Sequence, residues 1–438
     1  MNIIKPRERD AVIQSLRAGV VPRLGQHLIQ VGRLKEVEAL LRDIERCADG
    51  GSGIRFVIGE YGAGKTFFLN LVRSIALEKR LVTVHADLSP GRRLQLTGGQ
   101  ARSLYAELMR NIATRSKPEG EAMNNVVERF VSEALRDAKE NGNSPEDAIH
   151  SRLQGLSEMT GGYDFAQVIE AYWRGHDGGN EQLKSDAVRW LRAEFTTRTE
   201  ARVALGVRTI IDDASVYEHW KLMARFVRFA GFQGFFVVLD EMVNLYKLAN
   251  TQARNANYEQ ILKILNDCLQ GTACGLGVLM GGTPDFLMDT RRGLYSYHAL
   301  QSRLTENTFV TGSLVDHASP VLRLSSLSLE DLYVLLTKLR SVFAYGDPAR
   351  YLIPDEGLHA FMEHCSQRVG ESYFRTPRST ITAFVNLLSV LEQNPQASWQ
   401  ELLGQVQIEK GGDLAMDGNR EGVSVLPEGE NELATLRL

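Results

Sequence analysis

A lysine and a threonine follow a glycine-rich segment in an arrangement typical of a triphosphate-binding site. Residues 59–66 read GEYGAGKT, which matches G-x-x-x-x-G-K-[ST] with Gly59, Gly64, Lys65 and Thr66 in the required places. In this pattern the lysine ammonium reaches the β- and γ-phosphates, and the threonine hydroxyl is a ligand of Mg²⁺. The segment therefore predicts a P-loop that binds a nucleotide together with Mg²⁺.

The rest of the loop has residue types that suit close contact with an anion. We expect the glycines to allow positive φ angles and close backbone approach, and the helix that follows to direct free N–H groups at the phosphates. An accidental glycine-rich turn is the alternative, but an apolar run precedes the loop and a helical pattern follows it. The predicted nucleotide contacts are Gly59, Glu60, Tyr61, Gly62, Ala63, Gly64, Lys65, Thr66 and Phe67.

Two acids end a second apolar run, FFVVLDE at residues 235–241. Unbroken apolar residues are typical of a parallel strand that is buried on both faces. We expect Asp240 to hold Mg²⁺ through water, opposite Thr66, and Glu241 to orient and polarise the attacking water. A strand that merely ends in two solvated acids is the alternative.

Two further polar residues are candidates because of their place after predicted elements. Thr283 follows the apolar run at residues 276–280 and is a candidate sensor of the γ-phosphate, although it could equally start a proline turn. Arg33 precedes the helical pattern of residues 34–47 and is expected beside the adenine, unless it is an ordinary solvated arginine.

Arginines later in the chain are candidates for stabilising phosphoryl charge. Arg303 is expected to act as a finger in the site of a neighbouring subunit, with Arg291 and Arg292 in reserve. Arg378 lies in the first turn of a predicted helix, where a cation is unfavourable unless an anion lies nearby. We therefore expect Arg378, or else Arg375, to sense the γ-phosphate.

The order of predicted elements indicates an α/β fold of the P-loop NTPase type with an additional strand, the AAA+ arrangement. Strands are expected near residues 54–58, 81–86, 235–239, 276–280 and 321–324, in a parallel sheet of order 5-1-4-3-2. We expect a nucleotide-binding domain at residues 1–325, interrupted by a helical insertion at 116–206 that is either solvated or a partner surface. An all-helical lid at 326–406, with helices near 328–343, 355–369 and 377–392, and a flexible tail at 407–438 would follow.

Composition limits the partners and the compartment. A net charge of −4 and a pI near 6.2 give no general attraction to nucleic acid or to anionic membranes. The four cysteines are scattered and no apolar run approaches the length of a membrane span, so a cytoplasmic protein is expected. DNA contact is not indicated by the overall charge, but a local phosphate-tracking face is conceivable at Arg202, Arg208, Lys221, Arg225 and Arg228.

Several longer segments resemble a known family. IGEYGAGKTFFLNLVRSIA, ADLSPGRRL, VVLDEMVNLYKL, GGTPDFLMDTRRGLYSYHALQSRL and YFRTPRSTITAFVNLL together resemble the ATP-binding proteins of BREX bacteriophage-exclusion systems, the group of BrxC, BrxD and PglY, and most closely its smaller members. The likeness spans about residues 10–395. It implies an AAA+ ATPase that uses ATP and Mg²⁺ and acts with methyltransferase, phosphatase-like and helicase proteins, with homo-oligomer formation open. It supports Lys65, Thr66, Asp240 and Glu241, and more loosely Thr283, Arg303 and Arg378.

Mg²⁺-dependent ATP hydrolysis coupled to assembly or remodelling of a defence complex is the expected function. A nucleotide-gated switch or scaffold with little turnover is the first alternative, and a DNA-stimulated motor is the second. The length of the predicted insertion and the absence of sequence after the lid for a winged helix both depart from DNA-loading AAA+ proteins, so sequence-specific DNA binding is not expected.

Overall fold

A five-stranded parallel sheet forms the centre of the molecule. The computed structural model describes residues 4–95, 98–307, 309, 316–369 and 377–405. The strands are β1 (Gly53–Ile58), β2 (Val82–Asp87), β3 (Phe235–Asp240), β4 (Leu276–Gly282) and β5 (Val321–Arg323). Their order is β2-β3-β4-β1-β5, with every neighbouring pair parallel, as the sequence predicted.

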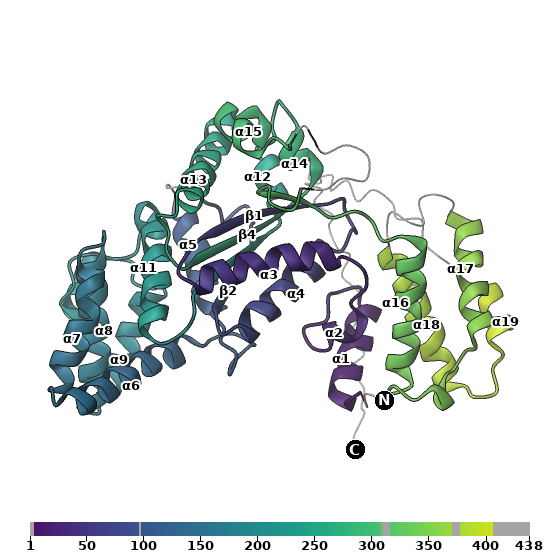
Figure 1. Ribbon diagram of the computed structural model, residues 1–438, viewed down its shortest axis with the longest axis horizontal. Coiled ribbons are helices and arrows are strands. Elements are labelled where there is room, and N and C mark those ends of the chain that lie inside the picture. The colour runs from purple at the N-terminus through teal and green to yellow at the C-terminus, as the bar shows by residue number, and fades with distance from the viewer. Residues whose placement is uncertain (1–3, 96–97, 308, 310–315, 370–376, 406–438) are drawn as a thin grey trace, which may run out of the picture.

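Apolar residues line both faces of this sheet, which explains why its strands are unbroken apolar runs. In β3, Phe236 and Val238 pack on one face with α3 (Leu34–Ala48) and α4 (Lys65–Glu78). Phe235, Val237 and Leu239 point to the other face, because successive strand residues alternate. That face is covered by α5 (Gln100–Arg110), α11 (Val216–Phe229) and α13 (Thr251–Leu269), so the nucleotide-binding part has three layers (Figure 1).

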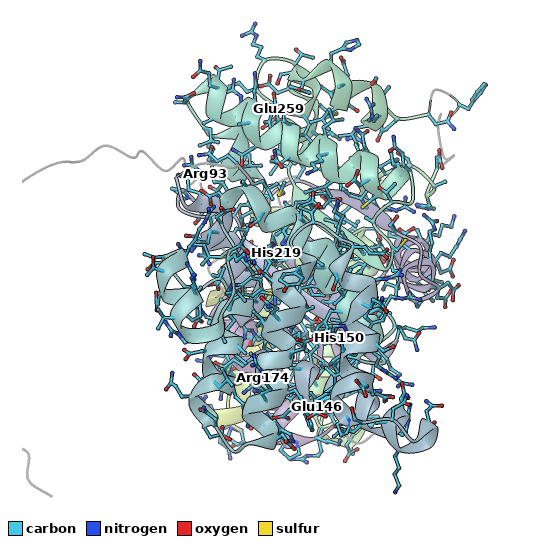
Figure 2. The ribbon with its side chains drawn as sticks, turned by 90° about the vertical axis from the view of Figure 1, so that its left-hand side faces the viewer. Arg93, Glu146, His150, Arg174, His219 and Glu259 are labelled. Carbon is cyan, nitrogen blue, oxygen red and sulfur yellow. The ribbon has the colours of Figure 1, made fainter. Side chains whose placement is uncertain are left out.

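A group of helices between β2 and β3 extends the core away from the sheet (Figure 1). Its members are α6 (Met123–Asn141), α7 (Pro145–Ser157), α8 (Gly162–Asp177), α9 (Glu181–Leu191) and α10 (Arg198–Leu205). They share one continuous hydrophobic cluster with α5, α11 and the sheet. Figure 2 shows their outer face, with Glu146, His150 and Arg174 at the surface. The expected domain boundaries and a partner-binding role for this face stay predictions.

The C-terminal helices form a second body with its own hydrophobic cluster. They are α16 (Leu329–Phe343), α17 (Asp355–Val369), α18 (Pro377–Gln393) and α19 (Trp399–Gln405), of which the sequence analysis did not identify α19. A capping box starts α16: Ser328 Oγ accepts a hydrogen bond from the backbone N–H of Asp331, and the Asp331 carboxylate accepts one from the backbone N–H of Ser328. The expected tail at 407–438 lies outside the described residues.

The first helix packs with this C-terminal body although more than 300 residues separate them in sequence. Val12 and Ile13 of α1 (Pro6–Arg17) and Ile29 of α2 (Gln26–Ile29) belong to the cluster of α16 and α18. The Arg9 guanidinium donates to Phe343 O at 3.1 Å, pairs with Glu392 and lies 4.6 Å from the ring of Tyr345. The N-terminal segment that contains α1 and α2 therefore packs with the lid helices and not against the sheet.

Three short helices complete the sheet's carboxyl edge: α12 (Val243–Tyr246), α14 (Pro284–Met288) and α15 (His298–Leu304). No helix among the described residues is long and apolar enough to cross a membrane.

Candidate functional site

The glycine loop connects β1 to α4 in the geometry that a phosphate-binding loop requires. Gly62 and Gly64 have φ of 79° and 78°, the left-handed region in which a side chain is unfavourable. Gly59 does not have a positive φ, contrary to expectation. A Cβ there would lie 3.2 Å from Leu324 O, which is tighter than most Cβ contacts, so this glycine allows the loop to pack closely against Leu324. The backbone N–H groups at the start of α4 remain free for an anion.

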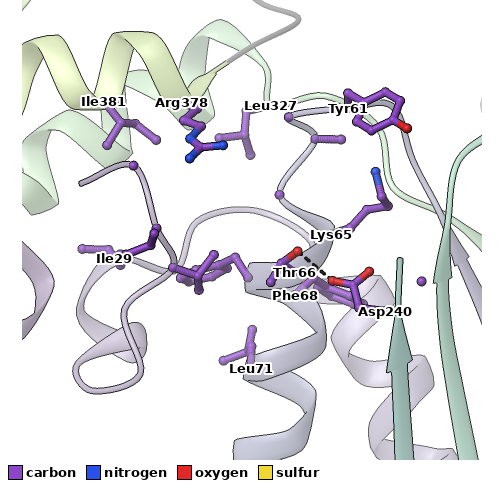
Figure 3. A pocket seen from close by; sticks show the side chains of 18 of the residues that line it. Ile29, Tyr61, Lys65, Thr66, Phe68, Leu71, Asp240, Leu327, Arg378 and Ile381 are labelled. Atoms are coloured by element: carbon purple, nitrogen blue, oxygen red, sulfur yellow. Dashed lines mark hydrogen bonds between the residues drawn. The ribbon is translucent and has the colours of Figure 1, made fainter. Parts of the chain in front are cut away.

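The predicted acid pair lies directly against this loop. Thr66 Oγ1 donates a hydrogen bond of 2.7 Å to Asp240 Oδ2, although 174 residues separate them in sequence (Figure 3). Parallel strands end at the same edge of a sheet, which is why the end of β3 meets the loop after β1. The other oxygen of Asp240 accepts from the Glu241 backbone N–H at 2.8 Å.

A glycine that the sequence analysis missed allows Asp240 to take this position. Gly281 lies in β4, the strand next to β3, and a Cβ there would be 2.6 Å from Asp240 Oδ1. Any larger residue would displace the carboxylate. The pair Gly281-Gly282, directly after the apolar run at residues 276–280, was a signal for such close approach.

Lys65 is held close to the loop from which it projects. Its Nζ donates to Gly59 O at 2.8 Å and to Glu60 O at 2.9 Å, and lies 5.4 Å from the centre of the Tyr61 ring. Burial lowers the pKa of Lys65, while the charges of nearby carboxylates oppose that shift. To contact β- and γ-phosphates, the ammonium has to leave these two carbonyl groups.

Glu241 has an unusual backbone and a perturbed carboxyl group. Its φ of 58° is rare for a residue with a side chain, and such strain is most common at functional sites. Burial raises its pKa, and the negative charges of Asp240 and Asp87 raise it further, against the opposing charge of Lys65. A carboxylate with a raised pKa is a better proton acceptor, which suits a group that polarises water.

These residues line a cavity of about 320 Å³ that extends from the loop to the lid (Figure 3). One end carries the charged groups Lys65, Asp240 and Glu241. The other end is apolar and is built by the N-terminal segment and the lid, through Val20, Val21, Pro22, Ile29, Val31, Leu327, Leu335 and Ile381. The sequence analysis missed this apolar wall, because it combines segments from both ends of the chain.

Arg33 lines the same cavity, but its guanidinium contacts protein. It donates to Ala63 O in the glycine loop and to Ser325 O at 3.3 Å, and it lies 5.9 Å from the ring of Phe68. Burial lowers its pKa, against the opposing charges of Glu36 and Asp331. Arg33 thus connects the loop to the segment before the lid, while the expected contact with adenine stays a prediction.

Thr283 and Arg378 both line the cavity. The Thr283 hydroxyl accepts from Phe286 N at 3.3 Å and so caps α14, which is the role of a threonine that starts a proline turn. Its sensing role stays a prediction. Arg378 is in the first turn of α18, with its guanidinium against Gly19 (Figure 3). No described carboxylate pairs with it, and its alternative, Arg375, lies outside the described residues.

The structure does not bring the three candidate finger arginines into this cavity. Arg303 donates to Asn266 Oδ1 and to Ala299 O, each at 2.7 Å. Arg292 donates to Leu248 O at 3.2 Å, and Arg291 is exposed. Their expected site of action is in a neighbouring subunit, so these roles stay predictions.

Two of the five basic residues suggested as a DNA-binding face form contacts within the protein. Lys221 pairs with Glu218 at 2.8 Å, and Arg228 donates to the carbonyl groups of Cys47 and Ala48. Of the set named from the sequence, Arg202, Arg208 and Arg225 remain exposed.

The side chains at the loop suit Mg²⁺ better than a transition metal. Thr66 and Asp240 offer only oxygen ligands, and Mg²⁺ characteristically takes one or two protein oxygens and completes its shell with phosphate and water. No group of three or more His, Cys, Asp or Glu side chains that could hold a metal occurs in the part of the chain that the structure describes. Thr66 and Asp240 are the residues that would hold the ion.

Comparison with known proteins identifies the family of the chain. No curated protein matches the chain. The family model described as BREX system ATP-binding protein BrxC/D matches residues 4–407, which include the sheet, the glycine loop, the acid pair and the lid helices. The chain therefore belongs to the family of BREX system ATP-binding proteins BrxC/D.

Proposed function

We propose that the chain hydrolyses ATP with Mg²⁺ at this cavity and couples hydrolysis to assembly or remodelling of a BREX defence complex. The hydrogen bond between Thr66 and Asp240 carries the proposal, because it joins a P-loop hydroxyl to a carboxylate at the end of a neighbouring parallel strand. Those two groups are the ones that hold Mg²⁺ in P-loop NTPases.

Five of the polar residues that line the cavity have a role in this proposal. Lys65 would contact the β- and γ-phosphates, and Thr66 with Asp240 would hold Mg²⁺, which neutralises phosphate charge when bound. Glu241, with its raised pKa, would take a proton from the attacking water. Arg378 would place its charge on the γ-phosphate from the lid, since it has no described carboxylate partner.

The apolar end of the cavity would take the adenine base. Its walls come from the N-terminal segment and the lid, which share one hydrophobic cluster. A base between this body and the glycine loop would link nucleotide binding to the position of the lid. A change in the position of the lid on hydrolysis would then act on methyltransferase, phosphatase-like or helicase partners. The described cysteines are all free thiols, in agreement with a cytoplasmic protein.

ATP binding and phosphate release by purified variants test the proposal. Lys65→Ala should lose ATP binding, whereas Glu241→Gln should retain ATP without releasing phosphate. Glu259→Gln is the matched control, because Glu259 is exposed on α13 and does not line the cavity (Figure 2). Turnover that persists in both site variants would refute the enzymatic proposal. Tight ATP retention without phosphate release by the wild type would assign the nucleotide-gated switch instead.

A further inference from the structure

Arg33 occupies a position whose backbone does not favour an arginine. Its φ of 60° lies in the left-handed region, which glycine adopts readily and residues with a side chain adopt rarely. Arg33 is the N-cap residue of α3, yet its side chain makes no capping hydrogen bond to that helix. Local structure therefore does not explain the arginine, and the explanation has to lie in what the guanidinium contacts.

The guanidinium contacts the glycine loop at one peptide group. Nη2 of Arg33 donates a hydrogen bond to Ala63 O. The other terminal nitrogen lies beside Gly64, since a Cβ on that glycine would be 3.4 Å from Arg33 Nη1. Arg33 therefore holds the carbonyl group of the Ala63–Gly64 peptide, which comes directly before Lys65 and the start of α4.

The orientation of this peptide decides whether the loop presents a donor or an acceptor to a phosphate. In a trans peptide the C=O and N–H groups point in opposite directions, and no described peptide bond is cis. The Gly64 N–H therefore points away from Arg33, and it has no acceptor among the described residues. A rotated peptide would put the Ala63 oxygen, which repels phosphate, in the place of that N–H group.

The glycine loop alone does not fix this orientation. Gly64 has a φ of 78°, and glycine takes positive and negative φ about equally well. Rotation of the peptide at Gly64 therefore meets little steric resistance, and a contact from outside the loop is needed to keep one orientation. A hydrogen bond from a charged guanidinium is stronger than one between neutral groups, so Arg33 is suited to this task.

Arg33 reaches the loop from the side of the lid. Its Nη2 also donates to Ser325 O at 3.3 Å, in the segment between β5 and α16. The preceding residue, Gly32, lies against the first turn of α16, where a Cβ would be 2.9 Å from Asp331 Oδ1. The segment that carries the guanidinium is thus packed on the lid, which gives the side chain a fixed base.

We propose that Arg33 is a positioning residue that fixes the Ala63–Gly64 peptide of the glycine loop with its N–H group free for a phosphate. The inference rests on the proposed ATPase function and differs from the contact with adenine that the sequence predicted. Arg33 acts on the phosphate end of the nucleotide through the loop, without contact to the phosphates.

This peptide can be observed directly in the nucleotide-free protein. Alanine labelled at its carbonyl carbon and glycine labelled at its nitrogen give NMR correlation signals only from Ala–Gly pairs. The sequence holds three such pairs, Ala18–Gly19, Ala63–Gly64 and Ala230–Gly231. Substitution of each alanine by serine assigns the signals.

Arg33→Ala and Arg33→Gly should both shift or broaden the Ala63–Gly64 signal, because the carbonyl group loses its donor. Arg33→Lys should return part of the wild-type position, since an ammonium has enough N–H donors for both carbonyl groups. Glycine suits the φ of 60° at this position, so Arg33→Gly keeps the test open if Arg33→Ala does not fold.

Arg129 provides the matched control. Its guanidinium also donates to backbone carbonyl groups, those of Ala230 at 2.9 Å and Gly231 at 3.4 Å, and it does not line the cavity. Arg129→Ala should move the Ala230–Gly231 signal and leave the Ala63–Gly64 signal and ATP affinity unchanged. The two substitutions thus report on different peptides in the same spectrum.

Ligands that lack the base or the phosphates locate the effect on binding. Tripolyphosphate has phosphates and no base, and adenosine has the base and no phosphate. Arg33→Ala should weaken binding of ATP and of tripolyphosphate by the same factor, about ten-fold or more, the equivalent of one hydrogen bond to a charged group. Adenosine binding should not change, and Arg33→Lys should recover part of both losses.

Three results would overturn the role of Arg33. If the Ala63–Gly64 signal stays in place in Arg33→Ala and Arg33→Gly, the guanidinium does not set this peptide, and any loss of affinity comes from direct contact with the ligand. If ATP binding weakens and tripolyphosphate binding does not, Arg33 acts on the base. If neither weakens, the orientation of the peptide does not matter for phosphate. A wild type that binds neither ATP nor tripolyphosphate would refute the proposed function, and the NMR signals would still show whether Arg33 holds the peptide.

Discussion

Gly281 gives the sharpest test of the metal-binding geometry. In Gly281→Ala the new Cβ would lie 2.6 Å from Asp240 Oδ1 and 2.7 Å from Leu69 Cδ1, both too close for van der Waals contact. The end of Leu69 can turn away. The carboxylate cannot move without disturbing its hydrogen bonds from Thr66, at 2.7 Å, and from the Glu241 N–H, at 2.8 Å.

The expected cost follows from these contacts. Overpacking of a well-packed site costs about 1–3 kcal/mol, and a lost hydrogen bond to a charged group costs about 1.5–3 kcal/mol. We expect Gly281→Ala to lose about 1–3 kcal/mol of unfolding free energy, because either the overpacked contact remains or Asp240 moves and loses a hydrogen bond, but not both. Displacement of Asp240 should also weaken Mg²⁺-dependent ATP binding by about ten-fold or more.

Gly277→Ala is the matched control in the same strand and on the same face. Its Cβ would lie 2.3 Å from Phe236 Cδ2 and 3.1 Å from Cys47 Sγ, so it overpacks the core without contacting Asp240. Denaturant unfolding should show comparable destabilisation in both variants. ATP titrations with and without Mg²⁺ should show a loss only in Gly281→Ala. Equal Mg²⁺-dependent affinity in the two variants would refute the inference that Gly281 sets the position of Asp240.

Loss of Arg9, which joins α1 to the lid, should destabilise the protein and weaken ATP binding, because the N-terminal segment is one wall of the cavity. Arg9→Ala should cost about 1.5–3 kcal/mol in denaturant unfolding, and unchanged stability would contradict the packing argument. Protonation of Glu241 should abolish its action on water, and its pKa is raised. As pH decreases, the steady-state hydrolysis rate should therefore begin to fall at a pH above about 4.3, the pKa of an ordinary glutamate. Burial, with smaller contributions from Arg73 and Arg23, lowers the pKa of His85 from 6.5 to about 4, so the unfolded chain binds a proton in this range that the folded protein does not. Stability should therefore fall as pH drops from 6.5 to about 4, by at most about 3 kcal/mol, and His85→Gln should show a smaller loss in unfolding titrations at the two pH values. Arg378→Ala should keep most ATP affinity and lose about ten-fold or more of kcat, and an unchanged kcat would remove the sensing role.

Local patterns in the sequence were sufficient for the sheet and for the charged end of the cavity. Strands buried on both faces need apolar residues at every position, so runs such as the one that ends at Asp240 could be recognised without any partner. A phosphate loop needs glycines and a lysine at fixed spacing, which makes residues 59–66 recognisable as well. Thr66 follows the first strand and its loop, and Asp240 ends the third strand. Because parallel strands end at one edge of the sheet, their contact could be expected from the sequence.

Only the tertiary structure decided what surrounds those groups. The need for glycine at position 281 depends on which strand lies beside Asp240 and how closely, and a residue pattern along one strand does not contain that distance. The apolar wall from Val20 to Pro22 depends on the packing of α1 against α16 and α18, at the opposite end of the chain. The sequence by itself thus determined which residues can do phosphate chemistry, because that depends on residue type and local spacing. The fold decided which of them meet and what encloses them, because contacts between distant segments are set by packing.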